Sequence, residues 1–123
     1  GIGPDGHTAS LFPGAPALDE TERWAVEVPA PAHVEPHVPR VTMTLPLLER
    51  SALVLFVVTG AGKQDALRRA LTEEPSPATP ASLVMADGLT CWLLDGAAAE
   101  ALGDVWDDDG DDAEDAGGAE PAR

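Results

Sequence analysis

Cysteine is almost absent from the 123-residue sequence, which contains Cys91 alone. A single thiol excludes a disulfide framework and a cysteine-based zinc site, and it fits a reducing, cytoplasmic compartment. Long apolar runs are also missing, since the longest, Ala52 to Val58, is strand-sized and far short of the roughly 20 residues of a membrane span. The N-terminus shows no basic region followed by an apolar stretch, so no signal peptide is predicted.

Basic residues are scarce as well. The sequence has 7 Lys and Arg against 22 Asp and Glu, a formal net charge of -15, which argues against nucleic acid and anionic membranes as partners. Nine of the acids lie in residues 103–123, which consist mainly of Asp, Gly, Ala and Glu. Such a segment cannot bury enough apolar surface to offset the entropy of ordering it. We therefore predict one folded unit over residues 1–102 and a disordered acidic tail over residues 103–123.

Segments typical of strands and of helices alternate along the folded unit. Residues 52–59 are almost continuously apolar, as in a strand covered on both faces of a parallel sheet. A glycine turn and an amphipathic helix over residues 63–71 follow, which is the first part of a βαβ unit. Further strands are predicted at residues 24–28, 40–44 and 90–94, and further helices at residues 45–50 and 95–102. The fold class is therefore α/β.

The opening segment, residues 1–14, has the composition of a shaped loop. Gly3 and Gly6 permit backbone angles closed to other residues and let a ligand approach the main chain, while Pro4 fixes one dihedral between them. Residues 8–12 are predicted to begin a short helix that ends before the following Pro-Gly pair. The N-terminus of such a helix would favour an anion.

His7 is the first candidate for chemistry, because imidazole titrates near neutral pH and can both take and return a proton. Asp5 lies two residues away, close enough to orient the ring or to raise its basicity. No Gly-x-Ser-x-Gly elbow surrounds Ser10, so a water activated by His7 is a simpler nucleophile than a serine. On composition alone, the alternative is a Gly-Pro turn that carries a solvent-exposed histidine.

Lys63 is the second candidate. It follows a buried strand and the Gly60–Gly62 turn and begins a helix, where backbone N–H groups already favour a phosphate. The turn is not a nucleotide-binding P-loop, because the spacing differs and Gln64 follows the lysine. The alternative is a solvated lysine at a helix start. Arg68 and Arg69 are predicted to lie on the solvated face of the same helix.

Arg40 and two histidines complete the set of candidates. Arg40 begins an apolar strand after a proline-rich loop, and it is either a bidentate anion clamp or a surface charge. His33 and His37 have the spacing of a metal-binding pair on a helix, but the prolines of residues 29–39 exclude a regular helix. No third ligand is evident, so no metal site is predicted. Asp95 is predicted to be the N-cap of the last helix.

The string Gly-Pro-Asp-Gly-His-Thr-Ala-Ser-Leu-Phe-Pro-Gly at residues 3–14 resembles the signature of the 6-phosphogluconolactonases. The wider group also holds the glucosamine-6-phosphate deaminases, whose loop carries Asp-Gly-His but continues with Ile-Ala-Phe-Asn-Glu-Pro. Here Thr8–Pro13 has the lactonase form. The resemblance extends to about Leu102 and includes Arg40–Leu45 and the strand, turn and helix of Val57–Leu67.

This resemblance implies a fold and an activity. The fold would be part of a mostly parallel, Rossmann-like sheet flanked by helices, the C-terminal half of a deaminase/lactonase-type fold. The family hydrolyses 6-phospho-D-glucono-1,5-lactone to 6-phospho-D-gluconate in the oxidative pentose phosphate pathway, with no metal or organic cofactor. A small sugar-phosphate lactone would therefore be the partner of this chain.

The resemblance also assigns roles to residues. The signature histidine and aspartate map to His7 and Asp5, as the proton-transfer residue and its companion. A lysine in the family's Gly-x-x-Lys turn holds the sugar phosphate and maps to Lys63, and Arg40 matches the family's Arg-hydrophobic-Thr-x-Thr segment. A further set of residues, expected to form the substrate loop, comprises Gly3, Gly6 and Thr8.

Family members carry roughly as much chain again before the signature. We therefore expect residues 1–102 to be the C-terminal portion of a sugar-phosphate lactonase domain, whose N-terminal half is needed to complete the site. On its own this chain is expected to be inactive. Two alternatives stay open: a non-catalytic truncated fragment or sugar-phosphate-binding module, and a glucosamine-6-phosphate deaminase.

Overall fold

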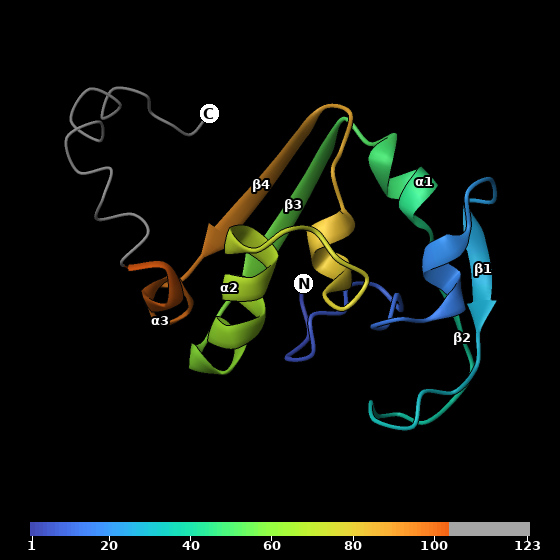
Figure 1. Ribbon diagram of the computed structural model, residues 1–123, viewed down its shortest axis with the longest axis horizontal. Coiled ribbons are helices and arrows are strands. Elements are labelled where there is room, and N and C mark those ends of the chain that lie inside the picture. The colour runs from blue at the N-terminus through green and yellow to red at the C-terminus, as the bar shows by residue number, and fades with distance from the viewer. Residues whose placement is uncertain (104–123) are drawn as a thin grey trace.

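The computed structural model describes residues 1–103. The predicted disorder of the acidic tail therefore falls, from residue 104 onward, outside the described residues. Strands and helices alternate along the described part, which confirms the α/β class (Figure 1). The strands are β1 (Ala25–Val28), β2 (Arg40–Met43), β3 (Leu53–Val58) and β4 (Leu89–Leu94), and the α-helices are α1 (Leu45–Glu49), α2 (Gln64–Thr72) and α3 (Gly96–Ala99). Short 3-10 helices are η1 (Pro16–Asp19), η2 (Ala61–Lys63), η3 (Pro80–Leu83) and η4 (Glu100–Leu102).

A parallel strand pair joined through α2 forms the larger part of the fold. β3 and β4 pair in parallel, in register from Leu53 opposite Leu89 to Val58 opposite Leu94. The predicted amphipathic helix is confirmed: its apolar positions include Leu67, which is fully buried in the cluster packed against β3. Phe56 stacks on Trp92 across the pair, with ring centroids 3.9 Å apart. Such stacking adds to the apolar burial that stabilises the pair.

The prediction that β3 is covered on both faces is wrong within residues 1–103. Its residues alternate, with Phe56 and Val58 buried while Leu55 and Val57 are about half exposed, at 50% and 52%. The side chains on this exposed face of the β3–β4 pair are Leu53, Leu55, Val57, Leu89 and Leu93. The helices of the described part pack against the other face, as the core cluster shows. The composition of β3 is thus typical of a strand buried on both faces, but within the described residues only one face is buried.

The remaining strands form a separate antiparallel hairpin. β1 and β2 pair from Ala25 opposite Met43 to Val28 opposite Arg40, and the proline-rich residues 29–39 connect them. The opening segment of the chain runs between this hairpin and the β3–β4 unit (Figure 1). Ile2 is buried in the core of the β3–β4 unit, and the Ser10 N–H donates to Thr42 Oγ1 of β2 at 3.0 Å. The opening segment therefore connects the two sheets.

The short helix predicted at residues 8–12 is wrong. Ala9 has a φ of 52°, in the left-handed region that a right-handed helix excludes. Thr8 and Leu11 form an isolated antiparallel bridge, with the Leu11 N–H donating to the Thr8 carbonyl at 2.9 Å. A turn replaces the helix, so His7 does not lie at a helix N-terminus.

The last helical segment follows its prediction. The Asp95 carboxylate accepts the Ala98 N–H at 2.9 Å, which makes it the expected N-cap of α3, and η4 continues the segment to Leu102. Asp95 also accepts the Gly60 N–H at 3.0 Å, so it ties the turn after β3 to the start of α3. Among residues 1–103, no helix has both the length and the apolar character needed to cross a membrane.

Candidate active site

The glycines of the opening segment give the loop around His7 its shape. The Gly3 N–H donates to the His7 carbonyl at 2.8 Å, and the Gly6 N–H donates to the Gly3 carbonyl at 2.9 Å, so the loop folds back on itself. A Cβ at position 3 would overlap the His7 ring and lie 2.9 Å from Asp5 Oδ1. Gly6 has a φ of 93°, and a Cβ there would meet the Thr79 side chain. Position 3 therefore requires glycine because a side chain has no space there, and position 6 requires glycine because of its positive φ.

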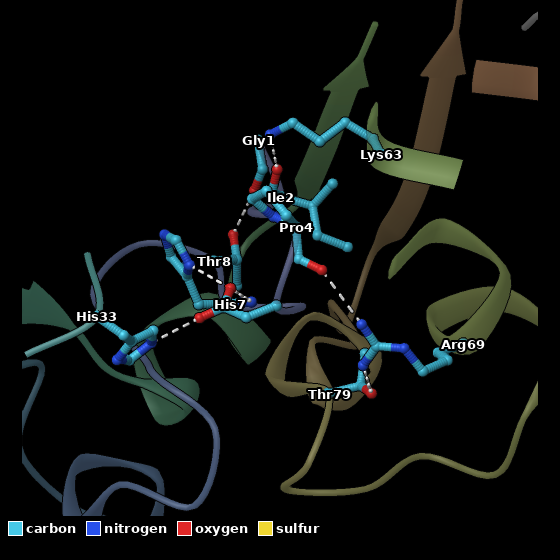
Figure 2. Close-up of polar contacts among 10 residues, drawn as sticks. Gly1, Ile2, Pro4, His7, Thr8, His33, Lys63, Arg69 and Thr79 are labelled. Carbon is cyan, nitrogen blue, oxygen red and sulfur yellow. Dashed lines mark hydrogen bonds and ion pairs between the residues drawn. The ribbon is translucent and has the colours of Figure 1, made fainter. Parts of the chain in front are cut away.

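This loop places His7 directly against Asp5. The distance from His7 Nδ1 to Asp5 Oδ1 is 2.6 Å, and the His7 backbone N–H donates to the same oxygen at 3.0 Å (Figure 2). Because an ionised carboxylate only accepts, Nδ1 carries the proton and the unprotonated lone pair of the neutral ring is on Nε2. His7 thus has the tautomer of a general base.

Asp5 remains ionised over the physiological pH range. Its partial burial acts to raise the pKa, but hydrogen bonds from the His7 backbone, the His7 ring and the His33 ring outweigh this and lower the pKa to about 2. The carboxylate is therefore available as a negative charge that stabilises a protonated imidazole. The sequence-based prediction that Asp5 orients the His7 ring agrees with this geometry.

Lys63 lies beside the same loop, although 56 positions separate it from His7. A cavity of about 370 Å³ is lined by Gly1, Ile2, Gly3, Pro4, His7, Thr8, Ala9 and Lys63. The Lys63 ammonium donates to the Ile2 carbonyl (Figure 2). An ammonium has three N–H donors, so two remain for a ligand. The Thr8 hydroxyl donates to the Gly1 carbonyl at 2.8 Å, which holds two of the lining residues together.

Lys63 has this position because of the turn that follows β3. It occupies the N-cap position of α2, at the end of η2, and Gly60 begins the turn with a φ of 92°. Hydrogen bonds from Ala98 and Gly60 lower the pKa of Asp95, which holds this turn through the Gly60 N–H. The lysine therefore begins a helix, as the sequence predicted, and its side chain extends toward the opening segment.

Arg40 does not line this cavity. Its guanidinium lies 5.5 Å from the centre of the Phe12 ring, and Nη2 donates to the Pro36 carbonyl at 2.8 Å. Nε is buried without a hydrogen-bond partner among the residues described. The Phe12 ring also contacts His7, at 4.9 Å between centroids, so Arg40 and His7 both pack on Phe12. The structure thus brings His7, Asp5, Gly3, Thr8 and Lys63 together, and Arg40 lies one aromatic ring away.

The contacts of two side chains with this loop were not predicted from the sequence. Arg69 was predicted to face solvent, but it donates to Thr79 Oγ1 at 3.0 Å and to the Pro4 carbonyl at 3.2 Å (Figure 2). His33 contacts the second oxygen of Asp5, with Nε2 2.9 Å from Oδ2 (Figure 2). Both contacts join segments far apart in sequence, and no local pattern signals them. Arg69 also forms an ion pair with Asp65, four positions earlier in α2, with Nε 3.1 Å from Oδ2.

The chain is similar to proteins that are named 6-phosphogluconolactonase. Residues 1–92 match the family described as glucosamine-6-phosphate isomerases/6-phosphogluconolactonase. The chain is 48% identical over 103 residues to the 6-phosphogluconolactonase of Rattus norvegicus, an alignment that covers 83% of this chain and 39% of the relative. It is 42% identical to the 6-phosphogluconolactonase of Synechocystis, again over 83% of this chain and 41% of the relative. The chain therefore spans about two fifths of the length of these relatives.

Solved structures of 6-phosphogluconolactonases also resemble this chain. The 6-phosphogluconolactonase of Trypanosoma brucei superposes with a TM-score of 0.71 at 32% identity, covering 82% of this chain and 40% of that chain. The enzyme of Trypanosoma cruzi gives a TM-score of 0.69 at 30% identity, covering 80% and 38%. Sequence and fold thus agree over the opening loop, the hairpin and the β3–β4 unit. The chain belongs to the glucosamine-6-phosphate isomerase/6-phosphogluconolactonase family.

Proposed function

We propose that the full-length protein carrying this chain hydrolyses 6-phospho-D-glucono-1,5-lactone to 6-phospho-D-gluconate in the oxidative pentose phosphate pathway. The observation that carries the proposal is the shared cavity of His7 and Lys63, with Asp5 on Nδ1 of the histidine. A base and a cation that line one cavity suit a substrate that has an ester at one end and a phosphate at the other. The names of the relatives support the same reaction.

In the proposed reaction, His7 Nε2 takes a proton from a water as the water oxygen attacks the lactone carbonyl carbon. The bond between that carbon and the ring oxygen then breaks. The ring oxygen receives the proton from the imidazolium and becomes a hydroxyl, and the former carbonyl becomes a carboxylic acid that ionises. Asp5 stabilises the imidazolium in between, because its charge lies 2.6 Å from Nδ1. General acid–base catalysis of this kind contributes on the order of 10²–10⁴ in rate.

The phosphate is assigned to Lys63, whose free N–H donors suit a dianion. Gly3, Gly6 and Thr8 form the substrate loop, since their conformations and contacts shape one wall of the cavity. Arg40 is a secondary phosphate contact in this proposal. Because it packs on Phe12 outside the cavity, its side chain has to turn toward the substrate to take that role.

We also propose that an N-terminal region of the full-length protein completes the site and covers the exposed face of the β3–β4 pair. The exposed leucines and valine of that face support this, as does the share of about two fifths that the chain represents of its relatives. The 123-residue chain alone is then expected to be inactive. A cytoplasmic location is proposed from the single cysteine, and some relatives are named chloroplastic.

The test is lactone hydrolysis by the full-length protein, measured above the spontaneous rate, for His7→Gln beside the matched control His37→Gln. Gln at position 7 cannot act as a base, so kcat/KM should fall by about 10²–10⁴-fold. His37 is an exposed histidine of the proline-rich loop, and its replacement should leave kcat/KM unchanged. Activity of His7→Gln within a few-fold of the wild type contradicts the assignment.

Lys63→Met tests the phosphate contact in the same assay. Loss of a charge-assisted hydrogen bond is worth roughly 1.5–3 kcal/mol, so KM should rise by about 10- to 100-fold with a smaller change in kcat. An unchanged KM rules out the contact. The two alternatives are separated by product: a deaminase releases ammonia from glucosamine 6-phosphate, and a sugar-phosphate-binding module binds 6-phosphogluconate without turnover of either substrate.

A further inference from the structure

A second imidazole lies on the carboxylate that orients His7. His33 comes from the loop between β1 and β2, and its Nε2 lies 2.9 Å from Asp5 Oδ2 (Figure 2). His7 contacts the other oxygen, Oδ1. The two rings also share an apolar neighbour, since Phe12 lies 4.9 Å from the His7 centroid and 5.6 Å from the His33 centroid. Phe12 is 5% exposed, so this packing is fixed by the core.

We propose that His33 is a positioning residue that orients the Asp5 carboxylate and, through it, the His7 ring. This inference rests on the proposed function, in which His7 is the general base. Each oxygen of Asp5 has an imidazole N–H as its partner, so rotation about the Cβ–Cγ bond of Asp5 breaks both contacts at once. His33 thereby keeps Oδ1 on His7 Nδ1, and the His7 lone pair stays directed away from Asp5.

Two replacements of His33 separate its hydrogen bond from the rest of the side chain. His33→Gln retains an N–H donor at about the position of Nε2, and His33→Ala removes the donor. His37→Gln, in the same loop, is the matched control. All three are made in the full-length protein, and kcat and KM for the lactone are measured.

In His33→Ala, kcat should fall several-fold, because the Asp5 carboxylate loses one of the two contacts that fix its orientation. His33→Gln should restore most of this kcat. KM should not change in either variant, since His33 does not line the cavity of His7 and Lys63. A kcat of His33→Ala equal to that of His37→Gln overturns the proposal.

An NMR measurement keeps the result distinct from the proposed function. The ring-nitrogen signals of His7 are identified in the full-length protein by their absence from His7→Gln, and they report which ring nitrogen carries the proton. A smaller share of the Nδ1-protonated form in His33→Ala supports the positioning role even if His7→Gln retains lactonase activity and the proposed function fails. An unchanged share overturns the role, whatever the kinetics show. Retained signals from Phe12 confirm that the variant is folded.

Discussion

Replacement of Asp5 by Asn removes the negative charge that contacts the His7 and His33 rings and preserves the shape of the side chain. The amide oxygen can take the place of Oδ1 and accept both hydrogen bonds from His7, at the 3.0 Å and 2.6 Å distances of the wild type. The amide nitrogen then faces His33, which has to present a lone pair instead of a proton. The variant therefore isolates the contribution of the negative charge to folding.

The magnitude follows from the pKa of Asp5, which is lowered from 3.8 to about 2. Each pKa unit corresponds to about 1.36 kcal/mol, so the ionised carboxylate contributes at most about 2.5 kcal/mol to folding. The side chain is 25% exposed, and solvent screening reduces this to about 1–2 kcal/mol. Because the folded-state pKa lies below the unfolded one, this stabilisation is present above about pH 4 and is lost as the pH falls toward 2.

Urea unfolding of wild type and Asp5→Asn at a series of pH values measures this directly. The variant should be less stable by about 1–2 kcal/mol near neutral pH, and the difference should shrink as the pH falls through the range between about 4 and 2. A stability difference that does not change with pH refutes the reasoning, because it would arise from packing instead of charge.

Two further variants test the geometry of the loop. Gly3→Ala introduces a Cβ into the space of the His7 ring, so kcat should fall by at least about tenfold, whereas Gly96→Ala, which meets no neighbour, should leave kcat unchanged; equal activity of both variants excludes the close packing. Arg69→Gln removes the hydrogen bond to the Pro4 carbonyl and should lower kcat several-fold while KM rises, with Arg68→Gln on the same helix as the control; identical kinetics of the two variants exclude a role for Arg69 in the loop.

Local patterns predicted the regular elements well. The apolar periodicity of residues 63–71 corresponds to α2 (Gln64–Thr72), and the β-branched segment before Leu45 corresponds to β2 (Arg40–Met43). The Asp5–His7 contact could also be expected, because the two residues are two positions apart and the glycine between them permits the tight turn. Each of these features depends on residues close in sequence, which is the information that a single sequence carries.

The prediction of a helix at residues 8–12 is wrong because of contacts with residues outside this segment. Its composition allows a helix, but Thr8 donates its hydroxyl to the Gly1 carbonyl, and Ser10 donates its N–H to Thr42 of β2. These partners compete with helical hydrogen bonds and fix a turn in which Ala9 has a positive φ. Tertiary contacts therefore override a weak local preference, and no pattern within the segment could have indicated them.

The same reasoning explains why Arg69 and His33 were missed while Lys63 was found. A lysine after a buried strand and a glycine turn has a recognisable local context. The roles of Arg69 and His33 exist only because the opening segment passes between the hairpin and α2: Pro4 and Arg69 are 65 positions apart, and Asp5 and His33 are 28 apart. A charged side chain that looks solvated on its own helix or loop has to be judged against every segment that can reach it. For the loop that carries the proposed catalytic base, those distant contacts determine how precisely the base is aimed.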